Sequence, residues 1–323
     1  MVLYNQTPWR KEELIMKILI FGIGGIGGFV GGALARVADS IYFYSRGENG
    51  RTIGEKGIQV DSALLGSFTA HPAKVSHEAG EMGPMDLVFL SCKGNGLKEA
   101  CRELAPMVTK DTVVVPLLNG VLVSELMEPL LPACHVADGT IRVFSHREGP
   151  GHVVQTAGSG KIVMGMKDGK NPPALYEAAA LLQKAGIPAE VTGDIRLDSW
   201  EKYALMGSNS AVFCYFDGPA GIVRQQEDYL SVLHEAVGEV MAVAKAKGVS
   251  FPVEYEENYI RIYRSLPCDT VTSLYRDLSG GKKAEDTEAA MILGRMVDMG
   301  KETGVEVPVF RRAWEWAMKQ NRK

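Results

Sequence analysis

The chain has 323 residues, a length that accommodates about two domains, and its 46% hydrophobic and 23% charged residues are ordinary for a water-soluble globular protein. The net charge of −4 lacks the basic excess of a nucleic-acid-binding protein, and no apolar stretch reaches the roughly 18–20 residues of a membrane span. We therefore expect a small-molecule partner, with no nucleic acid and no membrane involved.

The five cysteines are scattered, odd in number and never spaced as C-x-x-C, which favours free thiols in a cytoplasmic protein over a disulfide framework. The six histidines show no ligand spacing such as H-x-x-x-H, so we expect no metal. Residues 1–15 precede the first predicted strand and lack the apolar segment of a signal peptide. We interpret them as a surface extension without function, or as residues upstream of a true start at Met16.

The first predicted elements are a strand at 16–21, a glycine-rich turn, a helix and a second strand at 41–44. The turn reads Gly22-Ile23-Gly24-Gly25-Ile26-Gly27, a G-x-G-x-x-G pattern. In this pattern the first glycine makes a tight turn, the second lets the backbone approach a pyrophosphate, and the third lets the helix pack on the strand. The chain has 36 glycines, so chance is an alternative, but the strand–turn–helix–strand context favours dinucleotide binding.

The end of the second strand indicates which dinucleotide is bound. A NAD-selective site places Asp or Glu about 20 residues beyond the turn, where it accepts a hydrogen bond from the ribose 2′-OH. Here that place holds Ser45 and Arg46. A guanidinium suits the 2′-phosphate of NADP, so we predict NADPH/NADP+ as the cofactor. Glu48, two positions further on, keeps NAD open as the alternative.

The rest of the first half alternates strands and helices. Short β-branched runs at 86–90 and 112–118 flank a helical pattern at 96–108, which favours a parallel sheet covered on both faces. Further strands at 136–144, 152–155 and 161–166 are expected to form a more antiparallel extension, before a helix at 173–185 and a strand at 189–191. Ligands of such sheets bind at the carboxyl ends of the strands. Ser45-Arg46, Ser91–Lys93 and Asn119-Gly120 follow three of these strands, so we expect them to face one crevice.

From Asp194 onward, strand patterns give way to long 3.6-residue periodicities. Helices are predicted at 196–214, 227–247, 252–265 and 285–303, with prolines and paired glycines between them. We therefore expect three parts: the extension 1–15, a nucleotide-binding domain 16–190, and a helical domain 191–323 that closes the crevice.

Lys202 lies one to two turns inside the first of these helices, which Asp194 is placed to cap. At 100° per residue, Asn209 falls about 20° from Lys202 on the same face. A lysine sheltered from water has a lowered pKa and can donate a proton near neutral pH. From the helical pattern alone, a solvated surface lysine is the competing interpretation.

Together these features resemble the ketopantoate reductases (2-dehydropantoate 2-reductases), over essentially the whole chain from Met16. The matching elements are the glycine turn with Arg46, Lys93, Asn119-Gly120, the segment Thr192-Gly193-Asp194-Ile195-Arg196…Trp200-Glu201-Lys202, Ser273, and Glu285 twelve residues later. The resemblance implies an α/β fold with an N-terminal Rossmann-type doubly wound sheet plus a C-terminal all-helical domain like that of 6-phosphogluconate dehydrogenase. It also implies NADPH-dependent reduction of 2-dehydropantoate to pantoate, a step of pantothenate and coenzyme A biosynthesis.

The resemblance further implies a role for each matching residue. Lys202 is the general acid toward the keto oxygen, and Asn119 lies between the nicotinamide ribose, the lysine and the substrate. Ser273 holds the substrate carboxylate, and Glu285 lies near the cofactor and the substrate hydroxyl. Arg46 and Lys93 are the basic residues near the 2′-phosphate.

The chain departs from the family where asparagines usually hold the substrate. Those positions carry Met206, Ser210 and Ala220. Ser210, together with Asn209 one residue before it, is expected to bind substrate instead. The departures leave the reaction in place and open a second hypothesis, a related NADP-dependent reductase of another 2-oxo acid or of an opine-like substrate.

Two further questions stay open from the sequence. A non-catalytic NADP-binding sensor is a hypothesis of another class, against which the presence of Lys202 and Glu285 argues. Helical second domains of this superfamily often pair, so a homodimer is an alternative to a monomer. Tyr255, Tyr259 and Tyr263 recur every four residues and are expected to pack within the helical domain.

Overall fold

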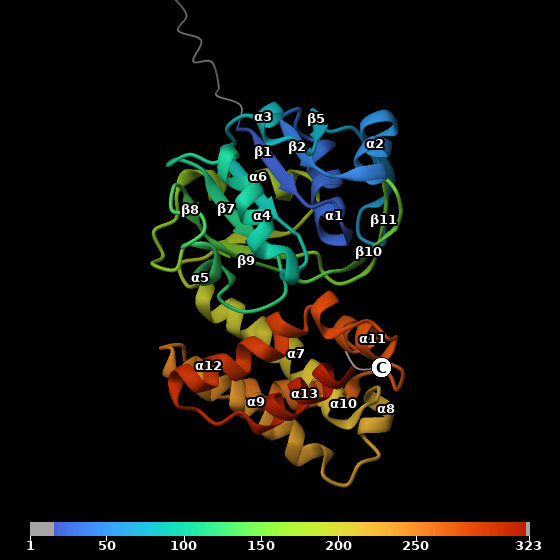
Figure 1. Cartoon of the computed structure of the whole chain (residues 1–323), viewed down its shortest axis with the longest axis vertical. Helices are drawn as coiled ribbons and strands as arrows, with labels where there is room; N and C mark the ends of the chain where they lie inside the picture. The colour runs from blue at the N-terminus through green and yellow to red at the C-terminus, as the bar shows by residue number, and fades with distance from the viewer. Residues whose placement is uncertain (1–15, 321–323) are drawn as a thin grey trace, which may run out of the picture.

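The computed structural model describes residues 16–320, so the expectation for 1–15 falls outside the described residues. Figure 1 shows a half that contains all the sheets and a half built from helices, with α7 (Ile195–Phe216) running from one into the other. Among residues 16–320, no helix is long and apolar enough to cross a lipid bilayer.

The first half is built on a six-stranded sheet in which every strand pair is parallel, with the order β5-β2-β1-β6-β7-β8. Its strands are β1 (Ile18–Phe21), β2 (Ile41–Tyr44), β5 (Lys74–Ser76), β6 (Leu87–Leu90), β7 (Val113–Pro116) and β8 (His135–Val136). The order reverses at β1, where β2 continues to one side and β6 to the other. This is the Rossmann-type doubly wound arrangement, and the predicted fold class is confirmed.

Alternation along β1 explains why both faces of the sheet are covered. Ile18 and Ile20 point into one apolar core, whereas Leu19 and Phe21 point into the core on the opposite face. Helices cover both faces, as a continuous apolar strand requires. They are α1 (Gly25–Ala35), α2 (Gly47–Lys56), α3 (Ala79–Met82), α4 (Leu97–Leu104) between the 3₁₀ turns η1 (Gly94–Gly96) and η2 (Ala105–Met107), α5 (Val123–Met127) and α6 (Pro173–Lys184).

Two smaller sheets complete this half. One has the order β10-β11-β3-β4 and the other β13-β12-β9, and each contains both parallel and antiparallel pairs, so the expected extension is mixed. Their strands are β3 (Ile58–Ser62), β4 (Gly66–Ala70), β9 (Asp138–Ile141), β10 (Phe144–Gly149), β11 (His152–Ala157), β12 (Ile162–Gly165) and β13 (Ala189–Val191). The sequence did not predict β3, β4 and β5. These strands are short and partly exposed, and polar residues interrupt their apolar pattern.

Every described element after β13 is helical, in agreement with the predicted all-helical C-terminal part. After α7 come α8 (Ala220–Val223), α9 (Tyr229–Ala246), α10 (Tyr255–Ser265), α11 (Ser273–Ser279), the 3₁₀ turn η3 (Ala284–Asp286), the π-helix η4 (Ala290–Gly294), α12 (Arg295–Thr303) and α13 (Pro308–Lys319). The Asp194 side chain accepts a hydrogen bond from the Leu197 backbone N–H at 3.3 Å, so it caps α7. Helices α11 and α13 were not predicted, and the expected helix 285–303 is split into η3, η4 and α12.

The two halves meet along α7 and η4. Thr140 of β9 and Arg142, which follows β9, both donate to the Asp198 carboxylate of α7. Val121 and Leu122, which follow β7, belong to the helical core. Asn95 of η1 donates through its side-chain amide to the Glu285 carbonyl at 3.1 Å. These contacts set the position of α7 relative to the carboxyl ends of the parallel strands.

Candidate active site

The glycine turn packs so closely that side chains have no room at two of its positions. A Cβ on Gly27 would lie 2.0 Å from the Gly22 carbonyl oxygen, and one on Gly25 would lie 2.4 Å from the Ser145 carbonyl oxygen of β10. Gly22 itself has φ +93, a conformation that glycine adopts readily. The turn therefore keeps its backbone N–H groups bare at the start of α1, as a phosphate-binding turn requires.

A cavity of about 520 Å³ opens beside this turn, and we call it the glycine cavity. Residues from four segments line it, among them three basic residues. They include Gly22, Ile23, Gly24, Ser45, Arg46, Asn49, Ser91, Lys93 and Arg147. Its size, its bare glycine backbone and its cations fit the phosphates of a dinucleotide.

The basic residues of the glycine cavity come from separate elements. Arg46, at the end of β2, has a side chain that is 58% exposed and forms an ion pair with Glu103. Lys93 follows β6. Arg147 of β10 was not anticipated, because nothing in the local sequence shows that β10 folds back against α1. Glu48, the residue that left NAD open as the alternative, is exposed and does not line this cavity.

Lys202, Asn119 and Glu288 form the second group of the site. The Lys202 ammonium nitrogen lies 3.5 Å from the Asn119 Oδ1, and the Asn119 Nδ2 donates to the Glu288 carboxylate at 3.0 Å. Asn119 thus uses both ends of its amide, so its orientation is defined by an acceptor on one side and a cation on the other. The three side chains come from α7, the turn after β7 and the turn before η4.

Glu285, which the resemblance places near the cofactor and the substrate hydroxyl, is not the glutamate of this group. Its side chain is 67% exposed and lies 3.8 Å from the Lys283 ammonium, outside the group. Glu288 takes the place because it stands directly before the apolar run 289–293, which docks against the first half. Within that run, Met291 lies against Gly94 and Gly120. In the sequence, the position of Glu288 directly before this apolar run could have indicated that its side chain lies at the site.

The environment of Lys202 changes its acid strength. Burial of the ammonium, followed by the nearby positive charge of Arg142, lowers the pKa of Lys202 from 10.5 to about 8. The negative charges of Glu288 and Asp198 act in the opposite direction and are outweighed. A lysine with a pKa near 8 is protonated at neutral pH and still acidic enough to donate a proton.

The turn that carries Asn119 is held by a buried carboxylate. Asp138 accepts hydrogen bonds from the Ser124 backbone N–H at 3.1 Å and from the Ser124 hydroxyl at 2.6 Å. Between Asn119 and Ser124, Leu122 adopts φ 52, a left-handed conformation that is unfavourable for a leucine. Such strain persists where packing imposes it, often beside functional groups.

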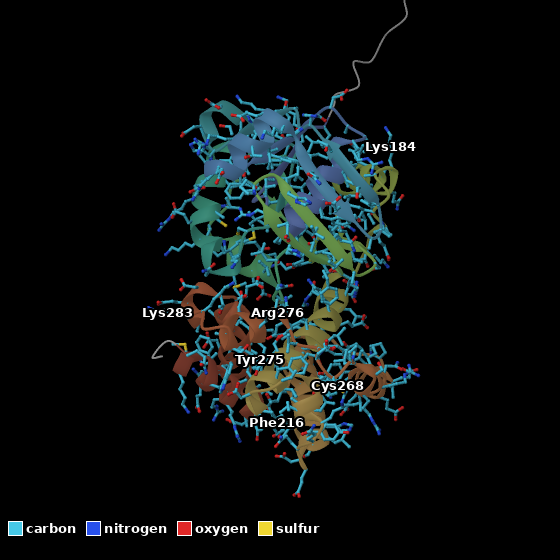
Figure 2. All side chains as sticks on the ribbon, turned by 90° about the vertical axis from the view of Figure 1, so that its right-hand side faces the viewer. Lys184, Phe216, Cys268, Tyr275, Arg276 and Lys283 are labelled. Atoms are coloured by element: carbon cyan, nitrogen blue, oxygen red, sulfur yellow. The ribbon has the colours of Figure 1, made fainter. Side chains whose placement is uncertain are left out.

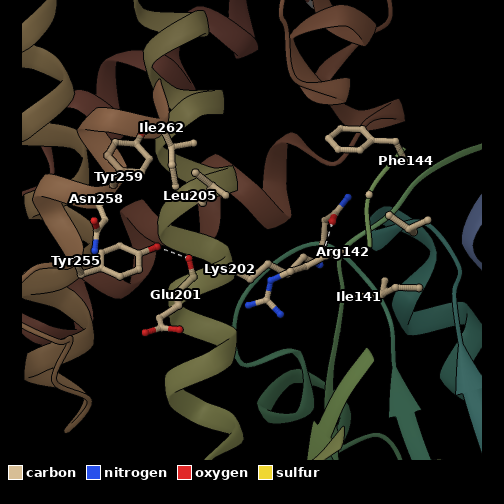
Figure 3. A pocket seen from close by; sticks show the side chains of 13 residues that line it. Ile141, Arg142, Phe144, Glu201, Lys202, Leu205, Tyr255, Asn258, Tyr259 and Ile262 are labelled. Carbon is tan, nitrogen blue, oxygen red and sulfur yellow. Dashed lines mark hydrogen bonds between the residues drawn. The ribbon is translucent and has the colours of Figure 1, made fainter. Parts of the chain in front are cut away.

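Lys202 faces a cavity of about 390 Å³, which we call the lysine cavity. Figure 3 shows α7 and α10 on one side of it, and Ile141, Arg142 and Phe144 on the other. The remaining lining residues include Asn119, Val143, Gly158, Glu201, Leu205, Tyr255, Asn258, Tyr259 and Ile262. Tyr255 and Tyr259 were expected only to pack between helices; both also contribute to this cavity.

Ser273 lies in a third cavity of about 320 Å³, the serine cavity, which Asn119 also lines. Ile26 of the glycine turn and Arg276 of α11 line it too, so this cavity lies between the other two. Figure 2 shows Arg276 at the edge of the helical half that faces the sheets. We expected the residues after three strands to face one crevice. The structure has three cavities there, and Asn119 lines two of them.

The structure does not bring the other two expected substrate residues into these cavities. Ser210 is completely buried, its hydroxyl donates to the Met206 carbonyl within α7, and it lines none of the three cavities. The Asn209 Oδ1 accepts from the Tyr259 hydroxyl at 2.9 Å, which places the amide behind the cavity wall. Helical spacing put Asn209 near Lys202 correctly but did not reveal that Tyr259 lies between Asn209 and the cavity.

A glycine turn at the carboxyl edge of a Rossmann-type sheet, opposite a sheltered lysine on a helical half, is the arrangement expected of an NAD(P)-dependent oxidoreductase. Comparison with known proteins identifies the family. Residues 18–169 match the family model "Ketopantoate reductase PanE/ApbA", and residues 194–320 match its C-terminal counterpart. The chain belongs to the ketopantoate reductase family.

Individual relatives match over nearly their full lengths. The 2-dehydropantoate 2-reductase of Halobacterium salinarum is 27% identical over 300 residues, covering 92% of this chain and 96% of that protein. The uncharacterized oxidoreductase YkpB of Bacillus subtilis is 26% identical over 304 residues, covering 93% and 97%. The crystal structure of a PanE/ApbA family ketopantoate reductase from Ralstonia eutropha JMP134 superposes with a TM-score of 0.83 at 26% identity, covering 95% of this chain and 99% of that one.

Proposed function

We propose that this protein reduces a 2-oxo acid to the 2-hydroxy acid with NADPH, and that 2-dehydropantoate, which would give pantoate, is the first substrate to test. The observation that carries the proposal is the Lys202 ammonium 3.5 Å from Asn119, in the lysine cavity, with Asn119 also lining the serine cavity that Ile26 of the glycine turn reaches. Relatives named 2-dehydropantoate 2-reductase support the choice of substrate.

The glycine cavity provides the proposed cofactor site. Gly22–Gly27 leave room for a pyrophosphate at the start of α1, and Arg46 and Lys93 provide positive charge for the 2′-phosphate. When bound, NADPH supplies a hydride to the substrate's carbonyl carbon. Arg46 is already paired with Glu103, so a phosphate there would compete with that carboxylate.

Lys202 supplies the proton in the proposed mechanism. As the carbonyl carbon gains the hydride, negative charge develops on the carbonyl oxygen, and a positioned ammonium stabilises that charge before giving up its proton. Asn119 directs the ammonium, and Glu288 holds the amide of Asn119. The neutral amine then takes a proton from solvent, which restores the acid.

We also propose that the boundary between the nucleotide-binding and helical parts lies near residue 190, between β13 and α7. All described strands precede it, and all described elements that follow it are helical.

Oxidation of NADPH followed by absorbance, with 2-dehydropantoate as substrate and NADH in a parallel series, tests the function. Turnover with NADPH supports it, and Lys202→Met provides the catalytic control. NADPH binding without turnover of any 2-oxo acid would instead favour the non-catalytic sensor.

A further inference from the structure

Two cations stand side by side in the lysine cavity, and the proposed mechanism uses only one of them. Arg142 lines the cavity and is near enough to Lys202 to lower its pKa. Its side chain is 37% exposed. The two like charges repel each other, and Asp198 and Glu288 offset part of that repulsion; an anion bound between the two cations would offset more of it.

Arg142 is held in place from behind. One of its terminal nitrogens lies 3.1 Å from the Asp198 carboxylate, and the other oxygen of that carboxylate accepts from the Thr140 hydroxyl. Asp198 lies one turn before Lys202 on α7, so the same helix positions both cations. A guanidinium anchored by one nitrogen keeps further N–H donors for a carboxylate.

Three polar groups on the opposite wall of the cavity already have hydrogen-bond partners. The Tyr255 hydroxyl donates to the Glu201 carbonyl, and the Tyr259 hydroxyl donates to Asn209. The Asn258 Oδ1 accepts from Arg261 at 2.6 Å. The side chains of these residues thus present mainly ring faces and carbon atoms.

Aliphatic and aromatic side chains complete this wall. Leu205 and Ile262 lie on the helical side, and Phe144 faces them from β10 with 68% of its surface exposed (Figure 3). The carboxylate of Glu201 points away from Lys202 in the same view. The wall therefore offers a substrate side chain an apolar surface.

We propose that the lysine cavity binds a 2-oxo acid with a bulky apolar side chain, its carboxylate on Arg142 and its side chain against Leu205, Tyr255 and Ile262. This inference rests on the proposed reductase function and specifies its substrate class. The side chain of 2-dehydropantoate ends in a hydroxyl, which would lose water against the aliphatic and aromatic carbon atoms of this wall. An apolar side chain would gain from the same burial.

The carboxylate half of the proposal is tested with an acid and its neutral ester. The probes are 4-methyl-2-oxopentanoate and its methyl ester, and the measured quantity is the ratio of their kcat/KM values. Any effect of Arg142 on Lys202 acts on both probes and largely cancels in the ratio. In Arg142→Gln the ratio should fall about tenfold or more, as expected for loss of a charge-assisted hydrogen bond.

Three comparisons make this experiment decisive. Arg142→Lys keeps the positive charge and should give a ratio between those of the parent and Arg142→Gln. This variant also tests the proposal if Arg142→Gln does not fold. Ser273→Ala is the matched control, because the family resemblance implies that Ser273 binds the substrate carboxylate. If Arg142 binds the carboxylate instead, the acid-to-ester ratio of Ser273→Ala should stay near that of the parent. A ratio unchanged in both Arg142 variants, or a fall in Ser273→Ala alone, would overturn the assignment to Arg142.

The side-chain half is tested with pyruvate, 4-methyl-2-oxopentanoate, phenylglyoxylate and 2-dehydropantoate at saturating NADPH. The two larger apolar acids should exceed 2-dehydropantoate in kcat/KM by about tenfold or more, the range expected for apolar groups in an apolar pocket. Leu205→Asn should reduce that preference. If 2-dehydropantoate ranks first, the apolar assignment fails while the reductase function stands; if no 2-oxo acid is reduced although NADPH binds, the proposed function itself fails.

Discussion

Replacing Lys202 with methionine should abolish catalysis and, at the same time, stabilise the fold. The two effects have one cause, the sheltered position of the ammonium. Methionine keeps a long, unbranched side chain but carries no proton to donate. Loss of a general acid typically lowers turnover by about 10²–10⁴-fold, so we expect a fall in kcat of that order.

The size of the stabilisation follows from the pKa of Lys202. In the folded protein this pKa is about 8, against 10.5 for an unburied lysine. At about 1.4 kcal/mol per pH unit, the protonated amine destabilises the folded state by up to ~3 kcal/mol, and by less to the extent that the amine reaches water through the cavity. Below pH 8 both states carry the proton and the full cost applies. Between about pH 8 and 10.5 only the unfolded state retains the proton, so stability rises with pH.

Three measurements check this prediction. Denaturant unfolding at pH 7 should show Lys202→Met to be the more stable protein, with the difference shrinking toward pH 10. The kcat/KM of the parent for reduction should decline as pH rises through about 8, because the acid loses its proton. NADPH should bind both proteins alike, since Lys202 lines the lysine cavity and not the glycine cavity. Near-normal turnover by Lys202→Met, or lower stability at pH 7, would refute the reasoning.

Three other variants test separate parts of the site. Arg46→Asp should raise the Kd of NADPH by about tenfold or more while changing that of NADH little, because the 2′-phosphate loses a charge-assisted bond; equal effects on both cofactors would contradict this. Glu288→Gln should lower kcat by about tenfold through the loosened Asn119, whereas Glu285→Gln, exposed and outside the group, should stay near the parent value; the reverse order would restore Glu285. Gly25→Ala should weaken dinucleotide binding and cost ~1–3 kcal/mol of stability, because the new Cβ would lie 2.4 Å from a carbonyl oxygen of β10; calorimetry showing no change would argue against the close packing.

The parts of the fold that could be predicted are those specified by nearby residues. The strand, glycine turn and helix at 16–35 follow from apolar runs and from backbone geometry that glycine allows. Helix α7 follows from its periodicity and from the Asp194 cap. Strands β3 and β4 were missed because they are short and partly exposed, and polar residues interrupt their apolar alternation.

The same division applies to the site. Lys202 and Asn119 were expected at the same site, and the Lys202 Nζ lies 3.5 Å from the Asn119 Oδ1. Asn119 follows the carboxyl end of a parallel strand, and ligands of such sheets bind at these ends. The first helix of the helical part faces the same edge. Glu288, and not Glu285, bonds to Asn119 because of the path of the chain between η3 and η4. Three residues, 287–289, separate these two elements. Spacing alone does not show which of two nearby carboxylates points inward.

By itself, the sequence determined the local chemistry of this protein: a turn that admits phosphates, an arginine where a carboxylate would select NAD, and a lysine set inside a helix. Tertiary structure alone decided which distant side chains meet. Arg142 and Arg147 enter the cavities from β9–β10 because that segment folds back over α1 and toward α7, and Tyr259 separates Asn209 from the substrate space because α10 packs on α7. Periodicity and backbone geometry act over a few residues, whereas these contacts depend on sheet order and helix packing across the whole chain.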